Sequence, residues 1–552
     1  MNRSHRISIL LVLLISVLCL GGPDPAAAGS ADLILYNGKV FTSDPDHLWA
    51  QAVAIEGQRI QAVGGNAEIL ALAGPATRRL DLAGRTVIPG LNDAHVHALA
   101  PQGVPVNLPD FVPGPGPGLQ EVLDLIEQAT QVHPPGTWLF AFVGTTVGDD
   151  PLANRFTLDQ AAPSHPVLLS MWTGHGMYLN SIGLQTLGIS ETEPDPFGGF
   201  FERVPGTDVL NGIVHEYAEH LVRRRFAEQL TDAQIAAIYQ AFVEAALRLG
   251  FTSVQNMSVG LQHARSNEIL EQVQPLLRWR EICFPLTLEE ACDFGKPAPL
   301  VTASGIKWIG DGTPVERLAF LSEPYADRPD TSGRFNFPAG DFNAMLEDGL
   351  HGPRKKQQLL FHLVGDAAIS TLLDEMTAVA PAAHWRSRRT RIEHGDLVLP
   401  SDVARLRDLG IVVVQNATHL SLPDLPQRLS PERLAEAQPL RSLVEAGVPL
   451  ALGTDGIGGT ISPFLDIFLA TFHPARPGEA LSREQAVIAY TAGSAYAEFA
   501  EHQKGRLAPG QLADLAVLSE DIFTAPPPVL LGTRSVLTVV DGQIVWDEGA
   551  VH

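Results

Sequence analysis

Two histidines separated by a single residue have the spacing in this chain that most directly suggests chemistry. They are His95 and His97, in the segment Thr86-Val-Ile-Pro-Gly-Leu-Asn-Asp-Ala-His-Val-His97. Alternate side chains of an extended strand point to one face, so both imidazoles project into the same space. Two converging imidazoles can hold one divalent metal, zinc above all. The alternative is a pair of unrelated histidines.

Short apolar segments alternate with stretches of helical composition through the centre of the chain. Counting the segment that carries His95, we expect eight strands, the others being 251–255, 277–283, 305–309, 359–362, 390–394, 411–415 and 449–455. Near-continuous apolar strands separated by helices indicate a parallel sheet covered on its outer face. One helix is well marked, because Thr231 and Gln234 form a capping box and Gly250 supplies the stop. The pattern predicts an α/β fold, a (β/α)8 TIM-like barrel with its active site at the carboxyl ends of the strands.

Both ends of the chain are rich in strand and turn signals. Asn37-Gly38 near the N-terminus and Asp541-Gly542 near the C-terminus each separate two apolar runs. Neither end has enough strands for a stable sheet of its own. We therefore expect one small β-sandwich built from residues 29–87 and 504–552, flanking a barrel domain of residues 88–503.

Residues from about 102 to 228 are too many for one connection within the barrel. This region is rich in proline and glycine at first, as in Pro113-Gly-Pro-Gly-Pro117, and then contains apolar strands such as 166–170. We expect it to form an inserted subdomain or lid after the first barrel strand.

The first 28 residues have the pattern of an export signal. Arg3 and Arg6 precede an apolar run over 7–20, and Ala26-Ala27-Ala28 provides a small-residue cleavage site. A transmembrane anchor needs about 20 apolar residues, and this run is shorter. We expect a secreted or periplasmic protein without a stable membrane anchor, with a mature start near Gly29.

The overall charge and the cysteines narrow the classes of partner. A formal net charge of -24 argues against nucleic acid or an anionic membrane as the main partner, but the charge does not name a substrate. The small-molecule substrate that we expect follows from the motifs described below. Cys283 and Cys292 remain after removal of the signal. We expect two buried or half-buried thiols, although one bridge is possible in an oxidising compartment.

Further metal-ligand residue types fall at the ends of the predicted barrel strands. Lys307 lies on strand four, His362 ends strand five, His394 ends strand six and Asp455 ends strand eight. Histidines scattered through a core would not favour strand ends in this way. Together with His95 and its neighbour, they predict a metal site at the catalytic rim of the barrel.

Several motifs give the chain a resemblance to a known family. From about residue 31 to 546 it resembles the amidohydrolase superfamily, and within it the YtcJ-like group of metal-dependent hydrolases (amidohydrolase family 3). The motifs that carry the resemblance are Pro89-Gly-Leu-Asn-Asp-Ala-His-Val-His97, Gly174-His175 with Asn180-Ser181, His362 with Gly365-Asp366, Arg391-Ile-Glu-His394, and Gly453-Thr-Asp455.

The resemblance implies a set of ligands for one or two divalent metals, zinc being the expected ion. The protein ligands would be His95, His97, His362, His394 and Asp455. Superfamily members with a lysine on strand four convert it with carbon dioxide to a carbamate, an anionic ligand able to bridge two metals. Lys307 would have this role here. The alternative is an ordinary lysine paired with Asp311 or Glu316.

The same resemblance implies metal-assisted hydrolysis. A metal-activated water would attack the scissile carbonyl while Asp455 takes the water's proton and passes it to the leaving nitrogen. His175 would stabilise the oxyanion or contact the substrate, the alternative being a hydrogen-bonded lid residue. Glu216 and Arg317 are candidate substrate-binding residues, with a structural ion pair as the alternative for Arg317. The remaining histidines considered are expected to be surface or core residues: His215, His351, His419 and His473.

The leading hypothesis is an exported hydrolase of C–N bonds, acting on an amide, N-formyl or N-acyl compound. The same activated water would also serve hydrolysis of a carboxylic or phosphoric ester. A third hypothesis is a non-catalytic binding protein on an amidohydrolase scaffold, which would be expected to lose ligands such as Asp455. By analogy with relatives, a homodimer is possible.

Overall fold

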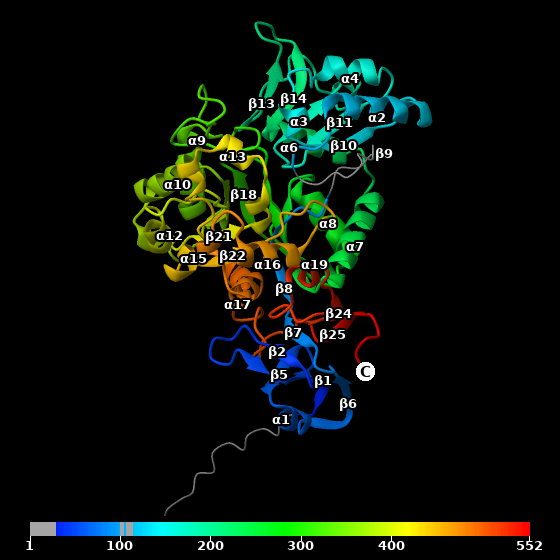
Figure 1. Cartoon of the computed structure of the whole chain (residues 1–552), viewed down its shortest axis with the longest axis vertical. Coiled ribbons are helices and arrows are strands. Elements are labelled where there is room, and N and C mark those ends of the chain that lie inside the picture. The colour runs from blue at the N-terminus through cyan, green and yellow to red at the C-terminus, as the bar shows by residue number, and fades with distance from the viewer. Residues whose placement is uncertain (1–28, 100–103, 106–113) are drawn as a thin grey trace, which may run out of the picture.

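The computed structural model describes residues 29–99, 104–105 and 114–552, so the expected export signal at residues 1–28 lies outside the described residues. Three parts follow one another along the long axis of the molecule (Figure 1). The inserted region lies at one end, the barrel in the middle, and strands from both chain ends lie at the other end. In the described part of the chain, no helix is long and apolar enough to cross a bilayer.

The central part is a parallel barrel, as predicted. Its strands are hydrogen-bonded in the order β22-β21-β20-β19-β18-β16-β15-β8. Backbone bonds from Asp455 N to His95 O (2.8 Å) and from His97 N to Gly456 O (2.9 Å) join the first strand to the segment after the last. The barrel strands are β8 (Leu91–Val96), β15 (Phe251–Ser258), β16 (Arg278–Cys283), β18 (Val301–Ile309), β19 (Leu359–Leu363), β20 (Arg391–His394), β21 (Val412–Gln415) and β22 (Leu450–Leu452), with β17 (Gly295–Ala298) paired antiparallel to β18.

Helices cover the outside of the barrel, and the best marked of them begins where the sequence predicts. In α7 (Asp232–Arg248), Thr231 caps the Gln234 amide and the Gln234 side chain accepts from Thr231 N, so the capping box is confirmed. The others are α8 (His263–Val273), α9 (Ala339–His351), α10 (Asp366–Val379), α11 (Ala382–Trp385), α12 (Val403–Leu409), α13 (Leu425–Arg428), α14 (Pro431–Leu434), α15 (Leu440–Glu445), α16 (Pro463–Phe472), α17 (Arg483–Ile488), α18 (Ser494–Ala497) and α19 (Pro527–Leu531), with the 310 turns η1 (Ala417–Ser421) and η2 (Pro477–Glu479) and the π-helical segment η3 (Ala489–Gly493).

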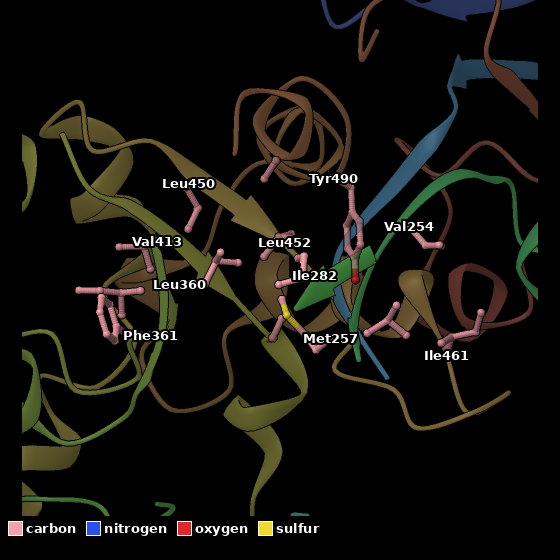
Figure 2. Packing of buried hydrophobic residues seen from close by; sticks show 14 of the residues in the cluster. Val254, Met257, Ile282, Leu360, Phe361, Val413, Leu450, Leu452, Ile461 and Tyr490 are labelled. Atoms are coloured by element: carbon pink, nitrogen blue, oxygen red, sulfur yellow. The ribbon is translucent and has the colours of Figure 1, made fainter. Parts of the chain in front are cut away.

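One continuous hydrophobic cluster joins the barrel strands to their covering helices. Figure 2 shows part of it, with Leu360, Val413 and Leu452 from three strands and Tyr490 from η3. These side chains are almost completely buried. The strands β19, β21 and β22 are mostly apolar, whereas β15, β16 and β20 also carry buried polar side chains such as Gln255, Arg280 and Arg391.

Strands from both chain ends form two packed sheets. One has the order β5-β4-β1-β6 and the other β25-β24-β23-β7-β2-β3, in which β7 pairs antiparallel with β23. Residues of both sheets share one core, for example Leu35 and Val53 with Val517 and Leu537. The elements are β1 (Ala31–Tyr36), β2 (Lys39–Phe41), β3 (Trp49–Ala50), β4 (Ala52–Glu56), β5 (Arg59–Gly64), α1 (Asn66–Leu70), β6 (Ala73–Asp81), β7 (Thr86–Pro89), β23 (Leu515–Leu518), β24 (Ser535–Val540) and β25 (Gln543–Asp547).

The inserted region has a mixed sheet of its own, in the order β13-β14-β12-β11-β10-β9. It packs two hydrophobic clusters that are separate from the barrel core. Its elements are β9 (Val104–Pro105), α2 (Leu119–Val132), β10 (Leu139–Val143), α3 (Thr145–Gly148), α4 (Arg155–Ala161), β11 (Val167–Met171), β12 (Gly176–Leu179), α5 (Ser181–Thr186), β13 (Gly199–Arg203), β14 (Leu210–Glu216) and α6 (Tyr217–Ala227).

The two remaining cysteines are joined. Cys283, the last residue of β16, forms a disulfide with Cys292, so the expectation of two free thiols is wrong. The sequence places the two residues nine apart but does not show that the intervening loop turns back on itself. In the structure, the Leu286 amide donates to Glu290, and this bond holds that loop closed.

Candidate metal centre

The predicted ligands meet at the carboxyl edge of the barrel, each delivered by a different strand except for the first pair. Ring centroids of His95 and His394 lie 4.9 Å apart, and those of His394 and His362 lie 4.3 Å apart. The positions are His95 in β8, His97 directly after it, Lys307 in β18, His362 in β19, His394 at the end of β20, and Asp455 just after β22.

Asp455 lies between the imidazoles. Its Oδ1 is 3.5 Å from Nε2 of His95 and 3.3 Å from Nε2 of His97, and its Oδ2 is 3.9 Å from Nδ1 of His394. These separations exceed the 2.7–3.2 Å of a normal N–H···O hydrogen bond. They are the separations expected of ligand atoms arranged around a common ion, since Zn–N bonds of about 2.0–2.1 Å at tetrahedral angles put ligand atoms about 3.4 Å apart.

The first pair of imidazoles is oriented by partners behind it. Nδ1 of His95 lies 2.7 Å from the Glu393 carboxylate, and Nδ1 of His97 lies 3.2 Å from the Met257 carbonyl. Both partners are acceptors only, so Nδ1 carries the proton and Nε2 presents its lone pair toward Asp455. Glu393 is itself held by two hydrogen bonds from the buried Arg391 guanidinium.

The backbone around Asp455 is fixed to the first strand. Asp93 accepts hydrogen bonds from the Thr454 amide (2.9 Å) and hydroxyl (2.6 Å). Asp455 has φ +51° and His394 has φ +72°, a region that non-glycine residues seldom adopt. Such conformations persist where surrounding contacts impose them, and they cluster at functional sites.

Two buried nitrogen atoms that lack hydrogen-bond partners in the described part of the chain indicate that a metal fits this site. Within the described residues, neither Nζ of Lys307 nor Nε2 of His362 has a hydrogen-bond partner. Burial lowers the pKa of Lys307 to about 8. Unpaired polar atoms are costly in an interior, whereas a bound ion would use them as ligands directly or, for lysine, after carbamate formation. The donor set of imidazoles and carboxylate therefore fits a divalent metal, and it is of the kind that zinc prefers.

Among the described residues, Lys307 does not pair with Asp311 or Glu316, the alternative considered from the sequence. Asp311 accepts three backbone hydrogen bonds, from Phe320, Val364 and Gly365, and Glu316 accepts from Thr173 and Thr313. No ion pair joins Lys307 to either carboxylate within the described residues.

His175 reaches the centre from the inserted sheet. Its ring lies 4.4 Å from that of His362, and Nδ1 is 3.1 Å from both oxygens of Glu216. Burial alone would lower its pKa, but the Glu216 carboxylate outweighs burial and raises the pKa of His175 to about 9. Glu216 has φ +55°, is completely buried, and also accepts from the Asn336 amide. It therefore contacts His175 and does not itself line an open space.

His419 belongs to the centre, contrary to the expectation of a surface or core residue. Its Nε2 is 3.7 Å from Oδ2 of Asp455, its Nδ1 is 2.8 Å from Asp396, and its ring stacks on His394 at 5.1 Å. It lies in η1, beyond the end of β21, so strand ends alone could not indicate it. Among the other three histidines considered, His215 pairs with Glu202 at 2.7 Å in the inserted sheet.

Arg317 lies at the edge of a cavity of about 900 Å3 between the inserted sheet and the barrel loops. Its guanidinium donates to Asp149 and Asp327, so the structure contains the ion pairs considered as the alternative. Glu316 also lines the cavity and is hydrogen-bonded to Thr173, two residues before His175. None of the six predicted metal ligands is among the described residues that line this cavity.

A parallel barrel with imidazoles and a carboxylate gathered at its carboxyl edge has the arrangement expected of a metal-dependent hydrolase. A sequence model described as "Amidohydrolase family" matches residues 78–546. The chain therefore belongs to the amidohydrolase family, in its YtcJ-like group.

Individual relatives agree with this assignment. The chain is 27% identical to the N-substituted formamide deformylase of Arthrobacter pascens, covering 94% of this chain and 98% of the relative. It is 24% identical to the putative amidohydrolase YtcJ of Bacillus subtilis (strain 168), covering 93% and 99% respectively. An uncharacterized metal-dependent hydrolase from Pyrococcus horikoshii OT3 has the same fold, with a TM-score of 0.69 at 21% identity over 90% of this chain and 99% of that one.

Proposed function

We propose that this protein is an exported, zinc-dependent hydrolase that cleaves the C–N bond of a small N-formyl or N-acyl compound. The observation that carries the proposal is Asp455, whose two oxygens face three imidazoles, from two different barrel strands, at 3.3–3.9 Å. Similarity to an N-substituted formamide deformylase over almost the whole chain supports this class of bond.

The residues that would hold the metal are those whose lone pairs converge at the barrel edge: His95, His97, His362, His394, Asp455 and, as a carbamate, Lys307. Nζ of Lys307 would attack carbon dioxide and lose a proton, and burial, which lowers the pKa of Lys307 to about 8, makes the uncharged amine that this step needs more populated than in an ordinary lysine. A divalent metal bound there supplies a Lewis acid that polarises the scissile carbonyl and makes water nucleophilic near neutral pH.

Asp455 acts as the general base in this proposal. Burial would raise its pKa, but the adjacent imidazoles, His95 first, hold the pKa of Asp455 well below its usual range, so it is ionised at neutral pH. It accepts the proton of the attacking water on one oxygen and delivers that proton to the leaving nitrogen. The amine then departs and the carboxylic acid, formate for an N-formyl substrate, remains.

His175 donates a hydrogen bond to the oxygen that becomes negative in the transition state. The Glu216 carboxylate keeps Nδ1 protonated and favours the imidazolium, so Nε2 is a donor. Glu216 thus acts on the substrate through His175. Arg317, neutralised by Asp149 and Asp327, forms part of the cavity wall in which the substituent of the substrate would lie.

The test is an assay of N-formyl amines, N-acyl amines, carboxylic esters and phosphate esters of matched substituents, followed by amine or acid release. We expect amine release from the formyl or acyl compounds, and a loss of about 10²–10⁴-fold in kcat for Asp455→Asn. Faster turnover of esters would move the activity to the ester class. No turnover of any compound by metal-loaded protein would favour a binding protein on this scaffold.

Export and assembly are separate parts of the proposal. The predicted export signal and the Cys283–Cys292 disulfide support an oxidising compartment outside the cytoplasm. N-terminal sequencing of the protein recovered from the periplasm or medium should begin near Gly29. Light scattering of the same sample distinguishes a homodimer from a monomer.

A further inference from the structure

The two oxygens of Asp455 face two different pairs of imidazoles. Oδ1 lies 3.5 Å from His95 Nε2 and 3.3 Å from His97 Nε2. Oδ2 lies 3.9 Å from His394 Nδ1 and 3.7 Å from His419 Nε2. Ligand atoms of each trio lie within 4.8 Å of one another. The carboxylate therefore has the arrangement of a bridge between two neighbouring positions.

His419 has the same hydrogen-bonding environment as the ligand candidate His95. In both, Nδ1 donates to a carboxylate, at 2.7 Å to Glu393 for His95 and 2.8 Å to Asp396 for His419. In both, the free Nε2 points at Asp455. A carboxylate behind an imidazole is the usual partner of a metal-binding histidine, because it fixes the tautomer and raises the basicity of the ligand nitrogen.

The separations match ligation better than a hydrogen bond. An N–H···O bond between His419 and Asp455 would require about 3.2 Å or less, and the distance is 3.7 Å. Within the described residues, Nδ1 of His394 has no hydrogen-bond partner, although the residue is buried. An ion between these three groups would use the facing lone pairs of both imidazoles and one lone pair of the carboxylate, which keeps others for the proton that Asp455 transfers.

We propose that His419 is a metal ligand which, with His394 and Asp455, forms a second metal position beside that of His95 and His97. This inference rests on the proposed function, since it assigns one more residue to the same centre. Asp396 is then a positioning residue that acts through His419, and the 310 turn η1 brings a ligand to the barrel edge from beyond strand β21.

Metal binding itself tests the inference, without any substrate. The exported protein is purified without chelator, and metal per chain is measured by plasma mass spectrometry. Stepwise Zn2+ affinities come from competition with a chromophoric chelator, and Co2+ substitution reports ligand changes through visible absorption. The variants are His419→Gln and Asp396→Asn. Asp396→Asn keeps the shape of the side chain, so it provides a second test if His419→Gln proves unstable. His215→Gln is the matched control, because His215 also pairs with a carboxylate, Glu202, but lies in the inserted sheet.

We expect two equivalents in the wild-type protein and in His215→Gln. His419→Gln should retain one equivalent with a changed Co2+ spectrum, and Asp396→Asn should weaken the second affinity about 10–100-fold. Two equivalents with wild-type affinities in His419→Gln would overturn the inference, as would a wild-type protein that holds one equivalent. A wild-type protein that binds no metal would instead refute the proposed function.

Discussion

At the scale of single residues, Lys307 is the side chain whose chemistry most needs an explanation. It is buried at the edge of a cluster of imidazoles, and within the described residues its Nζ has no hydrogen-bond partner. Burial lowers its pKa to about 8, because the charged form loses its hydration. An amine in that state is suited to carbamate formation, and the product would replace a repelling cation with a ligand.

The carbamate role predicts a specific loss in Lys307→Ala. We expect this variant to fold but to bind less metal and to lose about 10²-fold or more in kcat, because the metal centre loses an oxygen ligand. Metal per chain and kcat are measured with and without added short carboxylic acids, which can supply the missing oxygen. Lys307→Ala with wild-type metal content and activity would show that the carbamate role is wrong.

Most residues of this centre could be predicted because they lie at the ends of barrel strands. His419 was missed because it does not. His362, His394 and Asp455 could be predicted because periodicity identifies barrel strands and the barrel orients their carboxyl ends. His419 follows β21 by four residues, on a turn held by bonds from Thr418 to Asp466 and from His419 to Asp396. Those contacts join distant parts of the sequence, so no local pattern indicated them.

At the scale of elements, side chains from the inserted region and the barrel loops form a ring of ion pairs. Arg428 at the end of α13 donates to Asp149 and Asp327, and Arg317 donates to the same two carboxylates. Asp149 follows α3 of the inserted region, so the ring fastens that region to the barrel loops beside the cavity lined by Arg317.

Breaking this ring should loosen the inserted region. We expect Arg428→Met to lower the free energy of unfolding by about 1–2 kcal/mol, since Arg428 is buried and its partners are half exposed. Arg328→Met is the control, because Arg328 forms an exposed pair with Asp330. Urea unfolding and proteolysis of the 114–228 region measure the effect, and equal stability of the two variants would contradict it.

The ring also gives stability a dependence on pH. Burial alone would raise the pKa of Asp149 and Asp327. The guanidinium groups of Arg317 and Arg428 outweigh burial and lower both pKa values below the ordinary carboxyl value. The folded state therefore holds these carboxylates ionised more strongly than the unfolded chain does. Their contribution is present above the unfolded pKa of about 4 and is lost as pH falls through the lower folded values. In the Arg428→Met variant, the free energy of unfolding should therefore fall less as the pH is lowered.

The disulfide makes a second prediction at this scale. Cys283 and Cys292 close a loop nine residues apart, and a loop of that length is worth about 2–3 kcal/mol through the entropy of the unfolded chain. Cys292→Ser should lower the thermal midpoint, and reductant should destabilise the wild type but not the variant. Two reactive thiols in the untreated, unfolded wild-type protein would show that the bridge does not form.

At the scale of the whole molecule, the two chain ends are bound into one structure. Strand β23 lies between β24 and β7, so the sheet that contains β2 and β7 depends on residues more than 400 positions away. Turn signals and short apolar runs could predict strands at both ends. The order of those strands could not be predicted, because it depends on which edges the barrel brings together.

Removal of residues 504–552 should therefore leave the protein insoluble. The deletion exposes the edge of β7 and the apolar residues Val53 and Leu35 that pack with Val517 and Leu537. Solubility and size-exclusion chromatography of the truncated chain are the measurements. A soluble, monodisperse truncation would contradict the composite sandwich.

The central claim is that a metal at the barrel edge makes this protein a hydrolase. The most direct measurement is amine release from an N-formyl or N-acyl substrate by one sample before chelation, after chelation, and after stepwise return of Zn2+, with metal per chain determined at each step. The account predicts that activity disappears with the metal and returns in proportion to bound zinc, and that metal-loaded Asp455→Asn stays inactive. Undiminished activity in protein stripped of metal would contradict it.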